Sequence, residues 1–136
     1  MKRYRKHFNN SFQRAISPDA RSFYRRFYEI LISADPRIKD LFAKTDMDRQ
    51  ITMLMQSMTH IMTFSATLEP SDEIEKIAVA HGKNQLNITA EFYDIWLDSM
   101  IKTVDEIDPK FEGHIETSWR VLMAPGIEYM KSFCKK

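Results

Sequence analysis

The chain has 136 residues, of which 43% are hydrophobic and 12% aromatic, so it has the length of one typical domain and can bury a core. Its 20 basic and 19 acidic residues leave a net charge of +1, which argues against nucleic-acid binding driven by bulk charge. Residues 2–6 carry a basic cluster, which we interpret as the solvated end of a first helix.

The first half of the chain predicts helices and no sheet, because no long stretch alternates apolar and polar residues. A first helix is expected before Ser17-Pro18, and this pair predicts the start of a second helix with its apolar face over residues 23–31. Asp35-Pro36 predicts a short helix that reaches Phe42. A longer helix follows, whose apolar residues recur at intervals of three and four: Ile51, Leu54, Met55, Met58, Ile61 and Met62.

The second half continues the same pattern with three further helices. Residues 70–73, Pro-Ser-Asp-Glu, predict a helix start because acidic side chains are favoured at the positive end of the helix dipole. Thr89 is a candidate cap for the strongest apolar stripe, which runs over residues 92–107. Asp108-Pro109 predicts the start of the last helix, whose stripe covers residues 115–130.

These elements predict a single all-α domain over residues 1–136. We expect six main helices plus a short one, packed across one another or in a bundle. Pro125-Gly126 lies inside the last stripe, where a kink is expected rather than a stop.

The cysteine content and the longest uncharged stretch indicate in which cellular compartment we expect the protein. Cys134 is the single cysteine, so no disulfide forms within the chain, and we expect this residue to be a bystander near the end. Residues 50–68 are uncharged but contain Thr, Ser, Gln and His, which makes them too polar for a membrane span. The start lacks the apolar core of a signal peptide, so we expect a soluble cytoplasmic protein with no membrane partner.

His81 is the histidine that the patterning places in an apolar environment, since it shares a helix face with Ile74, Ile77 and Ala78. A core imidazole needs a hydrogen bond or a metal, and spacing alone favours the hydrogen bond. No second ligand lies at the spacing of a zinc or di-iron motif. A metal held by one protein side chain implies a macrocycle, of which haem is the common case.

Three segments in order resemble the haem domain of flavohaemoglobins and their single-domain bacterial relatives. They are residues 27–31, Phe-Tyr-Glu-Ile-Leu, then 35–42, Asp-Pro-Arg-Ile-Lys-Asp-Leu-Phe, and later 76–81, Lys-Ile-Ala-Val-Ala-His. Gln50 and Leu54 continue the resemblance on the intervening helix. The similarity covers residues 12–133, and it implies a globin fold with haem b between the fourth helix and the His81 helix.

The resemblance also implies a role for each matching residue. His81 would be the proximal ligand to the haem iron, and Phe42 would pack against the haem face. Tyr28 and Gln50 would face the bound gas, and Leu54 would form an apolar wall beside it. A phenol and an amide donor would stabilise a bound oxygen molecule that carries negative charge, and they would favour it over carbon monoxide.

Two departures from the flavohaemoglobin pattern limit what the resemblance implies. No flavin and nicotinamide reductase segment follows the globin-like part, so catalysis is expected to need an external reductase. Tyr93 is a candidate for the family's proximal tyrosine, at a spacing from His81 that is longer than expected, and Glu128 is not a clear match for its glutamate.

Three hypotheses about function therefore stand. The first is reversible binding of oxygen or another diatomic gas, such as nitric oxide or carbon monoxide. The second is a haem enzyme, a nitric oxide dioxygenase or peroxidase-like protein, working with an external reductase. The third is a cofactor-free helical interaction module. The sequence does not define an oligomeric state.

Overall fold

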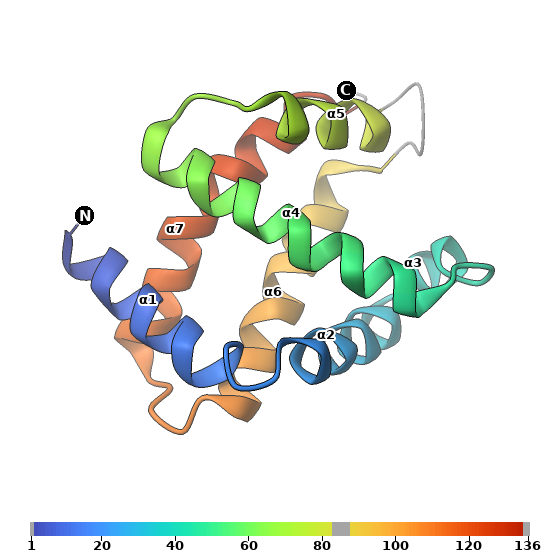
Figure 1. Ribbon diagram of the computed structural model, residues 1–136. Helices are drawn as coiled ribbons and strands as arrows, with labels where there is room; N and C mark the ends of the chain where they lie inside the picture. The colour runs from blue at the N-terminus through green and yellow to red at the C-terminus, as the bar shows by residue number, and fades with distance from the viewer. Residues whose placement is uncertain (1, 83–87, 135–136) are drawn as a thin grey trace.

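The computed structural model describes residues 2–82 and 88–134, and within these ranges it contains seven helices and no strand. Figure 1 shows them crossing one another, with α4 lying across the front of α6 and α7 in that view. The prediction of six main helices and a short one is confirmed. Their bounds are α1 (Lys2–Ala15), α2 (Ala20–Ala34), α3 (Pro36–Leu41), α4 (Met47–Thr67), α5 (Asp72–His81), α6 (Ala90–Ile107) and α7 (Gly113–Lys131).

Three helix starts follow the predicted local signals. Asp35 caps α3 by accepting a hydrogen bond from the Arg37 backbone N–H, with Pro36 in the first turn. Ser71 caps α5 in the same way. Thr89 occupies the cap position of α6, although its side chain makes no capping hydrogen bond.

Two predicted starts are wrong: α2 is capped by a later residue, and α7 begins at Gly113 with no side-chain capping hydrogen bond from Glu112. Ser17-Pro18 lies in the turn before α2, whose cap is Asp19; this carboxylate accepts from the Ser22 backbone and hydroxyl. Asp108 ends α6 and does not start α7. Its carboxylate is bound by the Ser11 hydroxyl and the Arg14 guanidinium of α1, so tertiary contacts replace the expected local cap.

The last helix continues through Pro125, as predicted. The following Gly126 allows α7 to approach α4, because a Cβ at this position would lie 2.9 Å from Cγ2 of Ile61. The close contact between α4 and α7 therefore depends on a residue without a side chain.

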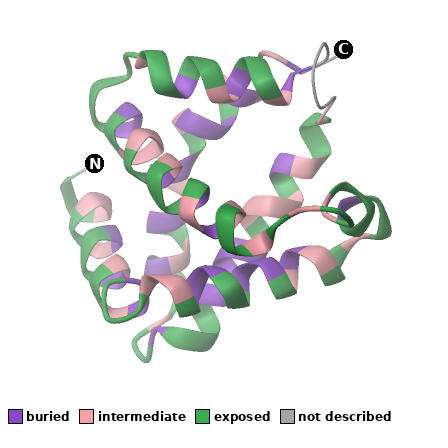
Figure 2. Ribbon diagram, turned by 45° about the vertical axis from the view of Figure 1, so that its right-hand side comes forward, coloured by how far each residue is buried: buried purple, intermediate pink, exposed green. Residues whose placement is uncertain are grey.

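The core lies where these helices cross, and it joins α1 to α7, α2 to α6 and α4 to α7. Figure 2 shows buried residues on the inward faces of the helices and exposed residues on their outer faces. The largest fully buried side chains are mostly aromatic: Trp119, Tyr24, Phe8, Phe23 and Phe27. Among the described residues, no helix is long and apolar enough to cross a membrane.

Candidate functional site

Tyr28 and Gln50 form a hydrogen-bonded pair between α2 and α4. The Gln50 Nε2 amide donates to the Tyr28 hydroxyl over 3.1 Å. Tyr28 is only 4% exposed, and its burial raises the pKa of the phenol to about 12, while the Gln50 hydrogen bond acts in the opposite direction. The phenol is therefore neutral at physiological pH. Its oxygen already accepts from Gln50, and its proton has no acceptor in residues 2–82 and 88–134.

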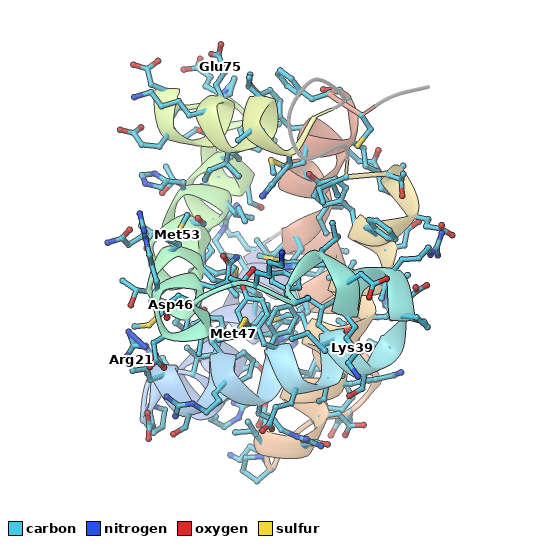
Figure 3. All side chains as sticks on the ribbon, turned by 90° about the vertical axis from the view of Figure 1, so that its right-hand side faces the viewer. Arg21, Lys39, Asp46, Met47, Met53 and Glu75 are labelled. Carbon is cyan, nitrogen blue, oxygen red and sulfur yellow. The ribbon has the colours of Figure 1, made fainter. Side chains whose placement is uncertain are left out.

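A capping residue of α4 and an arginine that reaches from α2 to α4 position this pair. Asp46 caps α4 one turn before Gln50, with its carboxylate accepting from the Arg49 backbone N–H. Arg21 of α2 donates to the Asp48 carbonyl and to the Thr52 hydroxyl of α4. Figure 3 labels both Arg21 and Asp46, where α2 meets the start of α4. Arg21 thus links the first turns of α4 to α2, and Asp46 stabilises the start of α4 itself.

Phe42 and Leu54 add apolar surface next to the pair. Phe42 follows α3, and its ring lies edge-to-face with the Tyr28 ring at a centroid distance of 5.5 Å. Leu54 is buried one turn after Gln50, on the same face of α4. The structure therefore brings Tyr28, Phe42 and Gln50 into one cluster, with Leu54 beside Gln50.

His81 is the last residue of α5 and is half-buried. Its Nδ1 atom is buried without a hydrogen-bond partner in the part of the chain that the structure describes. Burial lowers the pKa of the imidazole, which favours the neutral form. His81 therefore differs from the hydrogen-bonded core histidine that spacing alone favoured.

The backbone beside His81 is tightly held. A Cβ on Gly82 would lie 2.8 Å from the Phe133 carbonyl oxygen, so the end of α5 packs directly on the segment after α7. The Ile88 backbone N–H donates to the His81 carbonyl over 2.9 Å. These contacts fix the backbone at the end of α5, which carries the imidazole. Residues 83–87, which follow Gly82, lie outside the described residues.

Tyr93 and Cys134 are buried near the start of α6 and the end of α7. The Tyr93 hydroxyl is buried with no hydrogen-bond partner among the described residues, and burial raises the pKa of this phenol. It makes no hydrogen bond to His81. The Cys134 thiol is buried and lies 3.9 Å from the Met130 carbonyl oxygen, so this residue near the end of the chain packs in the core. Nothing in the local sequence marked this cysteine as part of the core.

Within the described ranges, no group of three or more His, Cys, Asp or Glu side chains is placed to hold a metal ion.

Comparison with known proteins gives one informative similarity. No protein family model matches the chain, and no curated protein matches it in sequence. A solved protein of Pseudomonas aeruginosa, described as structurally highly homologous to a human hemoglobin, has a TM-score of 0.87 to this structure. The match covers 96% of this chain and 97% of that chain, at 25% sequence identity. The chain therefore has a hemoglobin-like globin fold.

Proposed function

We propose that this chain is a haem-binding globin that reversibly holds oxygen or another diatomic gas, in a single domain over residues 1–136. His81 would be the iron ligand, and Tyr28 and Gln50 would contact the gas. The observation that carries the proposal is the Gln50–Tyr28 hydrogen bond, which leaves a buried, neutral phenol with a proton to donate. The hemoglobin-like fold and the sequence resemblance to flavohaemoglobins support it.

The His81 side chain fits the ligand role. A metal ligand must be a neutral imidazole, and burial of His81 favours that form. A satisfied core histidine would have its ring nitrogens hydrogen-bonded to protein groups, whereas no described residue bonds to the His81 side chain. No described residue therefore competes with a metal for the Nδ1 side of the imidazole.

The remaining residues have complementary tasks around a haem. When bound, haem b supplies an iron coordination position that takes up a diatomic gas. Tyr28 would donate a hydrogen bond to a gas molecule that carries partial negative charge, since Gln50 already occupies the phenol oxygen and leaves its O–H free. Leu54 and the Phe42 ring exclude water from the same region, which strengthens this hydrogen bond.

Reversible binding is supported better than the enzyme hypothesis. Flavohaemoglobins support their proximal histidine with a tyrosine and a glutamate, and no described carboxylate or hydroxyl contacts His81 here. Nitric oxide dioxygenase or peroxidase-like activity would use the same Tyr28–Gln50 pair and would require an external reductase. Repeated turnover of nitric oxide to nitrate with such a reductase would establish that activity over simple binding.

A visible spectrum tests the proposal directly. Protein produced with an adequate haem supply should show a Soret band, and the ferrous form should take up oxygen reversibly. His81→Ala should lose stable haem, whereas His60→Ala, which alters a half-buried histidine of α4, should retain it. A wild-type chain that folds but shows no Soret band would overturn the proposal and favour the cofactor-free helical module.

A further inference from the structure

A cavity of about 640 Å³ lies between α1, α2 and α4, apart from the Tyr28–Gln50 pair. Its α4 wall includes Met55, Met58, Thr59 and Met62, whose spacing of three and four places them on one face of the helix. Gln50 and Leu54 do not line it. A volume of this size is in the range of small-molecule sites in proteins.

Tyr24 of α2 contributes an unused hydrogen-bonding group to this cavity. Its side chain lines the cavity and is only 2% exposed, and its hydroxyl bonds to no described residue. Three side-chain polar atoms of the described residues are completely buried without a hydrogen-bond partner: Ser65 Oγ, His81 Nδ1 and Tyr93 OH. The Tyr24 hydroxyl is not one of them. The hydroxyl therefore keeps some exposed surface, and the Tyr24 side chain lines the cavity. Burial raises the pKa of the phenol, so Tyr24 is a donor at physiological pH.

The chemistry of the walls selects the kind of ligand. No charged side chain lines the cavity, so its walls offer a carboxylate or an ammonium group no ionic partner. The methionine side chains adapt their shape and make favourable contacts with aromatic rings, and Phe12 adds a ring of its own. Ser17, Thr59 and Thr63 contribute exposed hydroxyls, and the buried polar group of the lining is the Tyr24 donor, which pairs with an acceptor on the ligand.

The geometry points to a second binding site, in which an uncharged aromatic molecule fills the cavity and its carbonyl oxygen accepts a hydrogen bond from Tyr24. This inference does not depend on haem binding, because none of the cavity residues belongs to the proposed haem site.

Benzophenone, an uncharged aromatic ketone, is a suitable probe for the purified full-length chain. On irradiation its carbonyl oxygen abstracts a hydrogen atom from a nearby C–H group, and the two carbon radicals combine into a C–C bond. Mass spectrometry should locate the label on Met55, Met58 or Met62. Met53 is the matched control, because it is 50% exposed on α4 (Figure 3) and does not line the cavity. Absence of saturable binding, or labelling of Met53 to the same extent, would overturn the site.

Tyr24→Phe tests the hydrogen bond, with diphenylmethane as the matched ligand that lacks the carbonyl. The variant should bind benzophenone about three- to tenfold more weakly, the effect of one neutral hydrogen bond, and bind diphenylmethane as the wild type does. Chemical denaturation checks that the variant is folded. An unchanged affinity for benzophenone, or an equal loss for both ligands, would contradict the assignment of Tyr24 as the donor.

Discussion

The amide of Gln50 donates to the hydroxyl of Tyr28 over 3.1 Å, across the contact between α2 and α4. This direction of donation matters, because it uses the phenol oxygen as an acceptor and leaves its proton free. A tyrosine that served only to pack α2 against α4 would not need a half-buried amide to orient its hydroxyl. The relationship makes the pair, rather than either residue alone, the unit that contacts a bound gas in the proposed function.

Tyr28→Phe should raise the oxygen dissociation rate of the haem-loaded protein tenfold or more. The substitution keeps the ring that packs against Phe42 and removes the donor, and a hydrogen bond to a charged group contributes about 1.5–3 kcal/mol. Stopped-flow spectroscopy measures the rate. Carbon monoxide dissociation is the control and should change much less, because carbon monoxide gains little from a donor. An unchanged oxygen dissociation rate would remove Tyr28 from the gas-binding role.

Gln50→Leu should also speed oxygen dissociation, and its effect should not add to that of Tyr28→Phe. Because Gln50 acts by holding the Tyr28 hydroxyl, the amide has less to contribute once that hydroxyl is gone. A double-mutant cycle should therefore give a coupling free energy of at least about 0.5 kcal/mol. Additive effects would mean that the two side chains act on the gas independently.

Gly82→Ala should accelerate loss of haem from the protein. The added Cβ would stand 2.8 Å from the Phe133 carbonyl oxygen and 3.3 Å from that of Ala78, so the end of α5 must shift. Overpacking of this kind costs about 1–3 kcal/mol of folding stability. Transfer of haem to a competing acceptor protein measures the rate of loss, and urea denaturation measures the stability.

Gly113→Ala is the matched control for that experiment. A Cβ at Gly113, the first residue of α7, would meet no atom within 4 Å. Its stability and rate of haem loss should therefore match the wild type or improve slightly. If Gly82→Ala behaves as Gly113→Ala does, the close approach at the end of α5 does not position His81.

The sequence predicted features that depend on neighbouring residues and missed those that depend on distant ones. Asp35 caps α3 as expected, because its partner, the Arg37 N–H, lies two residues away. Asp108 carries the same local pattern before a proline, but Ser11 and Arg14 bind it from the other end of the chain. No periodicity relates residues separated in this way, so the local cap was predicted wrongly.

The candidate site also combines features that the sequence predicted with features that only the structure reveals. The order of Tyr28, Phe42 and Gln50 suggested a shared site, and the structure places these three in contact. The need for a glycine after His81 arises from its contact with Phe133, which the sequence does not reveal. Tyr24 could not be predicted either. Its position among the apolar residues of α2 is that of any core tyrosine, and only the structure places it on a cavity.

Asp108→Asn should destabilise the fold by about 2–3 kcal/mol at neutral pH, the scale of a buried, charge-assisted hydrogen-bond network. The Asp108 carboxylate accepts from the Arg14 guanidinium at 2.6 Å and from the Ser11 hydroxyl at 2.7 Å. Ser11 in turn accepts from the Trp119 indole N–H, so the carboxylate is linked to the centre of the core. Asp98→Asn is the control, since this exposed carboxylate of α6 pairs with Arg120 at the surface and should contribute less than about 1 kcal/mol.

The same network gives the wild type a pH dependence that the Asp108→Asn variant should lack. Burial alone would raise the pKa of the Asp108 carboxyl, but the hydrogen bonds from Arg14, Ser11 and the Lys110 backbone outweigh it and hold the pKa below its usual value. A carboxyl with a lowered pKa stabilises the fold above its unfolded-state pKa of about 3.9 and loses that contribution as the pH falls further. Urea denaturation from pH 7 to pH 3 should therefore show the stability difference between wild type and variant shrinking only below about pH 4. A difference that stays constant across this range would show that Asp108 contributes to the fold without its charge.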